Sequence, residues 1–371
     1  METNAMESSR PSLKHEIGIW KEIGRCLDSG ELVLSPFEQP YEEAKNIDVD
    51  QIEDNENFRP NDSFTPLEEL PNFKKDISQI TYTSKIKYFL DGSLRTKYIG
   101  EFVENSLSFP IIVSEVSVAV VTIKETKLLP HHIRKKIYFI FPNKKTGLVP
   151  DTVYEKLENL QSSFISKSTI TQIEFMKKEE IKGDLRSSIC AKARGLMHEL
   201  EQKAANELVK KPDEWLVMDG AIRSPEFKNL TNTIGLAKSF SRKPSFNISN
   251  KNHSLTSYLK RIKVGERTAV FSSYKDGPLF WYLRLRSFPP MEPLDGIVKI
   301  DLPLSQNKTD IIDSISSEIF ALRHPSVYPW PRWPSYIYPI RVTEMYMNAN
   351  LLGQYALSQI GLQLKSSIRG K

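Results

Sequence analysis

An eight-residue pattern that occurs twice constrains the fold of this chain more than any other feature. It reads FLDGSLRT from Phe89 to Thr96 and VMDGAIRS from Val217 to Ser224. Each copy ends an apolar run, which predicts a buried strand that brings Asp91 or Asp219 to its carboxyl edge, followed by a glycine turn. Neighbouring strand ends lie about 5 Å apart, and carboxylates held that close repel unless they share a proton or a cation. A single Asp-Gly pair is an ordinary turn, but the duplicated pattern predicts a paired site for a divalent metal.

Length and composition indicate a globular protein with a sizeable core. The chain has 371 residues, of which 39% are hydrophobic, which allows one large domain or two smaller ones. No apolar run reaches the roughly 18 residues of a membrane helix, and the sequence METNAMESSRPSLKHE at the start lacks the apolar stretch of a secretory signal. We therefore expect a cytoplasmic protein. The formal charge of +5 fits a polyanionic partner without requiring one.

Cysteine usage limits the kinds of metal site that the chain can form. The only cysteines are Cys26 and Cys190, far apart and without histidine-rich surroundings. Neither a disulfide framework nor a thiolate zinc site is therefore supported. Any metal must therefore be bound by oxygen ligands.

The order of predicted elements favours an α/β fold. Strands are expected from Ile80 to Leu90, Ser108 to Lys124, Lys136 to Phe141 and Trp215 to Met218. Before the last of these, apolar residues from Glu179 to Lys211 follow the helical period, and Pro212 ends that helix. The resulting β-β-β-α-β order, with acids ending the first and last strands, is the opening of an RNase H-like mixed sheet flanked by helices.

The remainder of the chain predicts a separate N-terminal extension and further sheet elements. Residues 1–78 contain amphipathic stretches at 13–34 and 64–80 joined by an acidic, mobile connector, so we expect a helical extension before a main domain at 79–371. After Asp219 the patterns predict helices at 230–239, 310–322 and 341–364, and strands at 268–272, 279–286 and 297–302.

Two glutamates are further candidates for the site. Glu201 lies on the apolar stripe of the long helix, where a charged side chain needs a partner. It is either a third metal ligand or a border residue that reaches solvent, and Arg194 on the same side could pair with it or contact a phosphate. Glu115 lies on the more polar face of its predicted strand, which favours an outward-facing residue of an antiparallel sheet. The alternative is that it lines the same cleft as the other acids.

Carboxylates without a histidine or cysteine constellation fit two-metal phosphodiester hydrolysis, with Mg²⁺ or Mn²⁺ as the ions. The chain has no Gly-x-Ser-x-Gly elbow and no Gly-x-x-x-x-Gly-Lys-[Ser/Thr] loop, which argues against a serine hydrolase and an NTPase. Basic residues that could contact a nucleic-acid strand, or form ordinary solvated surface, are Arg95, Arg194, Arg223, Lys238, Arg242 and Arg284.

The order of several short motifs resembles the NurA nuclease family. The motifs are Leu90-Asp-Gly-Ser93, the helix carrying Arg194 and Leu200-Glu201, Met218-Asp-Gly-Ala-Ile222, Ile234-Gly-Leu-Ala-Lys-Ser239, Tyr282-Leu-Arg284, Ile297-Val-Lys-Ile-Asp-Leu-Pro303 and Tyr338-Pro339. The resemblance runs from about Tyr82 to the carboxyl end. It implies an RNase H-like fold and DNA end processing together with a HerA hexameric translocase.

The resemblance also implies roles for individual residues. Asp91, Glu201 and Asp219 would be metal-binding acids, and Tyr338 would be the late tyrosine of the family's Tyr-Pro motif. The family has a histidine further on, where this chain has Met345-Tyr346. Tyr346 or the nearby Asn348 could hydrogen-bond a phosphate or a water, but neither supplies imidazole acid-base chemistry at neutral pH.

Three functions follow as hypotheses. The first is a manganese- or magnesium-dependent DNA nuclease, a 5′–3′ exonuclease and/or single-strand endonuclease that works as a homodimer with a HerA-like translocase in DNA repair. The second, motivated by the missing histidine, is a non-catalytic RNase H-like nucleic-acid-binding or adaptor protein. The third is a hydrolase of small phosphate esters.

Overall fold

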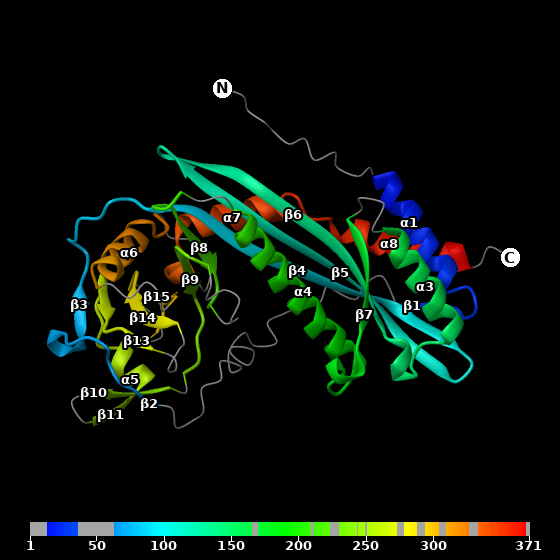
Figure 1. Cartoon of the computed structure of the whole chain (residues 1–371), viewed down its shortest axis with the longest axis horizontal. Helices are drawn as coiled ribbons and strands as arrows, with labels where there is room; N and C mark the ends of the chain where they lie inside the picture. The colour runs from blue at the N-terminus through cyan, green and yellow to red at the C-terminus, as the bar shows by residue number, and fades with distance from the viewer. Residues whose placement is uncertain are drawn as a thin grey trace.

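A large mixed β-sheet organises the structure (Figure 1). The computed structural model describes residues 13–35, 63–164, 170–208, 211–222, 230–242, 244–248, 251–272, 278–287, 294–303, 309–325 and 333–368. The strands are β1 (Glu31–Leu34), β2 (Ser63–Phe64), β3 (Lys74–Asp76), β4 (Ile86–Glu104), β5 (Leu107–Lys124), β6 (Lys127–Pro142), β7 (Thr171–Met176), β8 (Trp215–Asp219), β9 (Thr233–Ala237), β10 (Ser245–Ile248), β11 (Lys251–Ser254), β12 (Glu266–Thr268), β13 (Phe271–Ser272), β14 (Leu279–Arg284) and β15 (Ile297–Leu302). The helices are α1 (Leu13–Cys26), α3 (Asp151–Phe164), α4 (Leu185–Glu207), α5 (Leu255–Leu259), α6 (Thr309–Ala321), α7 (Tyr338–Asn348) and α8 (Gln354–Ile368).

The described strands form two sheets. The large one contains 12 strands in the order β3-β12-β14-β15-β9-β8-β4-β5-β6-β7, with β1 added to β4 and β13 to β14. The small one has the order β11-β10-β2. A mixed α/β fold, as predicted, is therefore confirmed.

The central strands β4, β5 and β6 are long and antiparallel, and β5 is buried along most of its length. The predicted strand at 108–124 is confirmed as β5. The prediction that the first strand ends at Asp91 is wrong, because β4 continues to Glu104 and Asp91 pairs with Ala119 within the ladder. Strand β6 likewise begins at Lys127 rather than near residue 136.

Strands β8 and β9 run parallel to the start of β4. Leu90 lies opposite Met218, and Met218 lies opposite Gly235. The predicted helix at 230–239 is wrong, because this stretch forms β9 with Thr233, Ile234 and Leu236 buried. A short apolar run cannot be assigned to a strand or a buried helix from periodicity alone.

Helices cover both faces of the central strands. Helix α4 packs with Leu90 and Met218 in one apolar cluster, whereas Phe89 and Val217 belong to another cluster that contains Ile340 of α7. Because neighbouring residues of a strand point to opposite faces, α4 and α7 lie on opposite faces of β4 and β8. Figure 1 shows α4 crossing the central strands in front.

Other helix predictions were partly correct. Helix α6 confirms the prediction at 310–322, but the terminal helix at 341–364 is in fact two helices, α7 and α8, separated at residues 349–353. Helix α3 and strand β7 were not predicted, so the observed order from β4 to β8 is β-β-β-α-β-α-β. Of the described helices, none is both long and apolar enough to span a membrane.

The N-terminal segments join the main sheet. Helix α1 lies in the predicted stretch, and its buried Trp20 donates from Nε1 to Thr171 Oγ1 at 3.0 Å. The predicted helix at 64–80 is wrong, because this region contains β2 and β3, and β3 pairs with β12. The acidic connector lies largely at 36–62, outside the described residues. The division at residue 78 stays a prediction.

Candidate metal centre

Asp91 and Asp219 lie side by side on β4 and β8. The parallel register places Leu90 opposite Met218, so each aspartate follows one member of that pair. Asp91 and Asp219 share the face of Phe89 and Val217, which is the face covered by α7. The proximity that the repeated pattern predicts is confirmed, although Asp91 lies within a strand and only Asp219 ends one.

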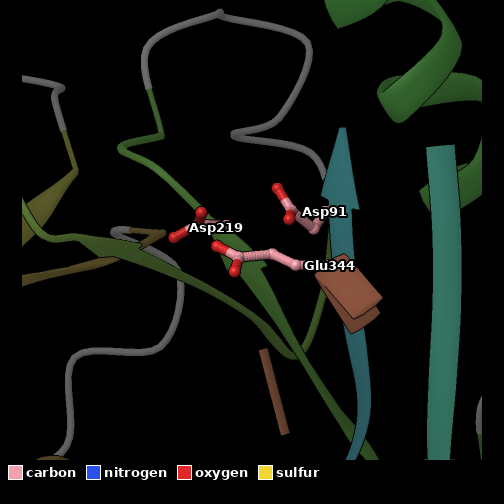
Figure 2. A group of neighbouring side chains, drawn as sticks. All are labelled: Asp91, Asp219 and Glu344. Carbon is pink, nitrogen blue, oxygen red and sulfur yellow. The ribbon is translucent and has the colours of Figure 1, made fainter. Parts of the chain in front are cut away.

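The third carboxylate of the cluster is Glu344 on α7, which the sequence analysis missed. One carboxylate oxygen from each of Asp91, Asp219 and Glu344 lies within 4.8 Å of the others. Figure 2 shows the three side chains converging from β4, β8 and the helix. Glu344 lies one helical turn after buried Ile340 and three residues before buried Met347, so it borders the sheet-facing side of α7.

Glu201 is close to this cluster but is not part of it. Its side chain is 8% exposed, which confirms its predicted place on the sheet-facing stripe of α4, and its Oε2 lies 2.9 Å from His198 Nδ1. The Glu201 carboxylate lies against Gly92, where any side chain would collide with it. Since Gly92 faces α4 and Asp91 faces α7, the strand separates Glu201 from the cluster. The partner of Glu201 is His198 rather than Arg194.

The surroundings of Asp91 disfavour its ionised form. Burial raises the pKa of this carboxyl well above its usual value, the neighbouring Asp219 raises it further, and Glu344 and Glu201 add smaller contributions. The nearby Lys238 opposes this shift. In the absence of a further cation, the cluster therefore favours a proton on Asp91.

Lys238 is the buried counterion of the cluster. Its Nζ lies 2.7 Å from Asp219 Oδ2, 3.4 Å from Glu344 Oε1 and 3.8 Å from the centre of the Tyr336 ring. Although burial lowers the pKa of Lys238, the charges of Asp219, Tyr336, Glu344 and Asp91 together raise it above its usual value. A second cation, Arg341, lies on α7 with Glu344, and its Nη1 donates to Glu344 Oε2 at 3.0 Å.

The residues present fit a divalent metal. Asp219 Oδ1 is buried and has no hydrogen-bond partner in the described part of the chain. A buried carboxylate oxygen without a donor is costly, and a cation would satisfy it. Three carboxylates are the hard oxygen ligands that Mg²⁺ and Mn²⁺ prefer. Asp91, Asp219 and Glu344 are therefore the residues that would hold the ion.

Several predicted contact residues have internal partners. Arg95 donates to Asn348 Oδ1 and to the Leu352 carbonyl, each at 3.2 Å. Arg284 is buried and donates to the backbone carbonyls of 259, 262 and 295. Lys238 lies in the acid cluster. The hydrogen bonds of these three cations thus lie within the fold.

The other predicted site residues lie at different places. Arg194 is partly buried and forms no hydrogen bond or ion pair among the described residues, whereas Arg242 is exposed. Tyr338 is 43% exposed at the start of α7, and Tyr346 is partly buried, two residues after Glu344. Arg223 lies outside the described residues.

Glu115 was expected to face outward, which is wrong. It is fully buried, 2.8 Å from Lys135 Nζ, and accepts a hydrogen bond from the Leu352 backbone at 2.8 Å. Strand β5 is covered on both faces, so the face that carries Glu115 also lies in the interior of the protein. Glu115 therefore anchors the segment between α7 and α8.

Comparison with known proteins gives a distant structural similarity. No protein-family model matches the chain, and no curated protein matches it significantly. Among solved structures, the chain is similar to the NurA nuclease from Sulfolobus solfataricus, with 10% sequence identity and a TM-score of 0.45. The alignment covers 80% of this chain and 89% of that chain. A similarity this distant assigns no function, which must be inferred from the residues of the site.

Proposed function

We propose that this protein is a divalent-metal-dependent phosphodiesterase that cleaves DNA. The observation that carries the proposal is the convergence of Asp91, Asp219 and Glu344 within 4.8 Å, with a buried oxygen of Asp219 lacking a partner. When bound, Mg²⁺ or Mn²⁺ would supply Lewis-acid activation of water and charge neutralisation at the scissile phosphate. Metal-assisted hydrolysis needs no nucleophile from the protein, which suits a centre of carboxylates.

The chain's own residues prepare the centre for this chemistry. The three carboxylates come from two paired strands and one packed helix, so their positions are fixed before a ligand binds. Lys238 holds Asp219 and Glu344 in place through its contacts at 2.7 and 3.4 Å. Burial raises the pKa of Asp91, and that carboxyl can release its proton when a cation binds.

A basic cavity supports a polyanionic substrate. It has a volume of about 420 Å³ and is lined by Lys87, Tyr88, Thr122, Ile123, Lys124, Lys211 and Glu214. Lys87 precedes Asp91 by four residues on the same strand, roughly 13 Å at the usual strand rise. Lysines of this kind contact phosphates and position nucleic acids, so the cavity is a candidate contact for a strand that extends along β4 from the acids.

The finer features of the proposal come from the sequence. They are an RNase H-like architecture, 5′–3′ exonuclease or single-strand endonuclease activity, a homodimer and a HerA-like translocase partner. The sheet segment β6-β5-β4-β8-β9, in which β8 runs parallel to β4, supports the first of these. The other features rest on the resemblance of the motifs alone.

The test is cleavage of single- and double-stranded DNA labelled at the 5′ or the 3′ end, with Mn²⁺ or Mg²⁺. Asp91→Asn and Asp219→Asn should each abolish cleavage while the circular dichroism spectrum is kept. Glu155→Gln, which removes an exposed carboxylate paired with Lys144, is the matched control and should cleave normally. Full metal-dependent activity in both aspartate variants would refute the proposal.

A non-catalytic adaptor is the second candidate. It is favoured by Lys238, which already supplies a positive charge to the cluster, and by the tyrosine at position 346 in place of a histidine. It predicts salt-sensitive DNA binding without cleavage by either metal. Competition by mononucleotides would instead indicate a hydrolase of small phosphate esters.

A further inference from the structure

Lys238 places a buried ammonium group within the acid cluster. Its Nζ lies within 3.4 Å of both Asp219 and Glu344, and its side chain is 10% exposed. It also lies over the ring of Tyr336 at 3.8 Å, a further favourable contact for a cation. Displacing this ammonium would break two ion pairs and this ring contact, so it is a fixed part of the centre.

The charges around the cluster balance with one divalent ion. The three carboxylates are faced by two cations, Lys238 and Arg341, which leaves one negative charge. Glu201 on the opposite face of β4 adds a second. A single divalent ion neutralises these charges, whereas two ions would leave an excess of two positive charges beside a buried ammonium. Such an excess is unfavourable in a largely buried site.

We propose that Lys238 takes the place of a second metal ion, so that the centre binds a single divalent cation. The inference rests on the proposed metal centre and replaces the two-metal arrangement expected from the sequence. Lys238 is a positioning residue here, because it orients Asp219 and Glu344 toward the ion and limits the number of ions that they can hold.

The experiment is a titration of the full chain with Mn²⁺, followed by calorimetry and by electron paramagnetic resonance of the free ion. The wild-type chain should bind one Mn²⁺. Lys238→Met, which keeps side-chain bulk without charge, should bind the first ion at least about tenfold more tightly, because a positive charge close to the ligands is removed. It should also bind a second ion.

Two further variants make the result specific. Lys238→Arg keeps the charge and should bind one ion with no gain in affinity. Lys135→Met removes a partly buried lysine that pairs with Glu115 outside the cluster, and it should bind Mn²⁺ as the wild type does. Thermal melts establish that each variant is folded before titration.

The outcomes separate this inference from the proposed function. Two Mn²⁺ ions in the wild-type chain, or an unchanged or weaker affinity in folded Lys238→Met, would overturn the inference and leave a nuclease possible. A single ion, with the expected response to Lys238→Met but no DNA cleavage, would support the inference and refute the nuclease. No Mn²⁺ bound to any of the variants would overturn both.

Discussion

Replacement of Asp91 by asparagine should remove metal binding and yet stabilise the metal-free protein. Asp91 is 7% exposed, lies beside Asp219 and Glu344, and has a pKa raised first by burial and then by Asp219. An asparagine has nearly the same shape and carries no charge. It therefore removes repulsion that the folded chain must otherwise bear when no cation is bound.

The magnitude follows from the geometry. Two unit charges 4.8 Å apart interact by about 3.5 kcal/mol at an effective dielectric constant of roughly 20. Asp91 is repelled by two carboxylates in the cluster, and the attraction of Lys238 offsets part of this repulsion. The net repulsion is therefore about that of one such pair. Because a proton on Asp91 can relieve part of it, we expect Asp91→Asn to raise the free energy of unfolding by about 1 to 3 kcal/mol near neutral pH.

The pH dependence has a defined sign. In the unfolded chain the pKa of Asp91 returns to about 3.9, whereas in the folded chain burial and Asp219 hold it higher. The folded state therefore binds more protons in this interval, and wild-type stability falls as pH rises from about 4 through the folded-state pKa. The asparagine variant lacks this loss, so its advantage should be largest near neutral pH and absent below about pH 4.

Urea unfolding with a chelator, followed by circular dichroism, measures this difference. Added Mn²⁺ should stabilise the wild type and leave Asp91→Asn unchanged, because only a folded state that binds the ion gains stability. Asp313→Asn is the control, since Asp313 pairs with Lys75 and Arg267, and its loss should cost about 3 to 5 kcal/mol. An Asp91→Asn variant less stable than the wild type in chelator near neutral pH would refute the reasoning.

Three further predictions concern neighbouring residues. Asp219→Asn should lose Mn²⁺ binding in calorimetry and, unlike Asp91→Asn, should lower stability in urea by about 1 to 3 kcal/mol, because Lys238 loses its nearest carboxylate. Glu344→Gln should weaken Mn²⁺ binding at least about tenfold, whereas Glu201→Gln should change it only a few-fold; equal losses would contradict the assignment of ligands. Gly92→Ala should lower the free energy of unfolding, measured in urea, by about 1 to 3 kcal/mol, because its Cβ would collide with Glu201. Unchanged stability would count against this contact.

The pairing of Asp91 with Asp219 could be predicted from the sequence because it depends on local patterns. Both apolar runs are short, β-rich and followed by the same dipeptide, and parallel neighbours bring equivalent positions together. Strands β5, β8 and β15 were predicted within one residue of their observed ends for the same reason. All three are rich in apolar and β-branched residues, and nearly all of their positions are buried in the structure.

Glu344 could not be chosen in the same way. Glu344 borders the apolar side of α7, just as Glu201 lies on the apolar side of α4. Helical periodicity therefore favours both residues equally. What separates them is which helix covers the face of Asp91, and that depends on tertiary packing that periodicity does not encode. The predicted helix at 341–364 also concealed the separate start of α7 at Tyr338.

The two glycines of the repeated pattern serve different physical purposes, which explains why one strand prediction was wrong. Gly220 has a φ of +104°, a conformation that favours glycine, and the chain does leave the strand there. Gly92 remains in the strand, and the absence of a Cβ gives room to the Glu201 carboxylate. The same Asp-Gly dipeptide thus marks a turn in β8 and a close approach in β4.

Register determines which acids can act together in this fold. Successive residues of β4 face α7 and α4 in turn, so Asp91 meets Glu344 while Gly92 meets Glu201. A shift of β4 by one residue would exchange these faces and send Asp91 toward α4. It would also place a side chain where Glu201 needs space. The packing of Glu201 on Gly92 therefore contributes to the register that brings Asp91 to Asp219 and Glu344.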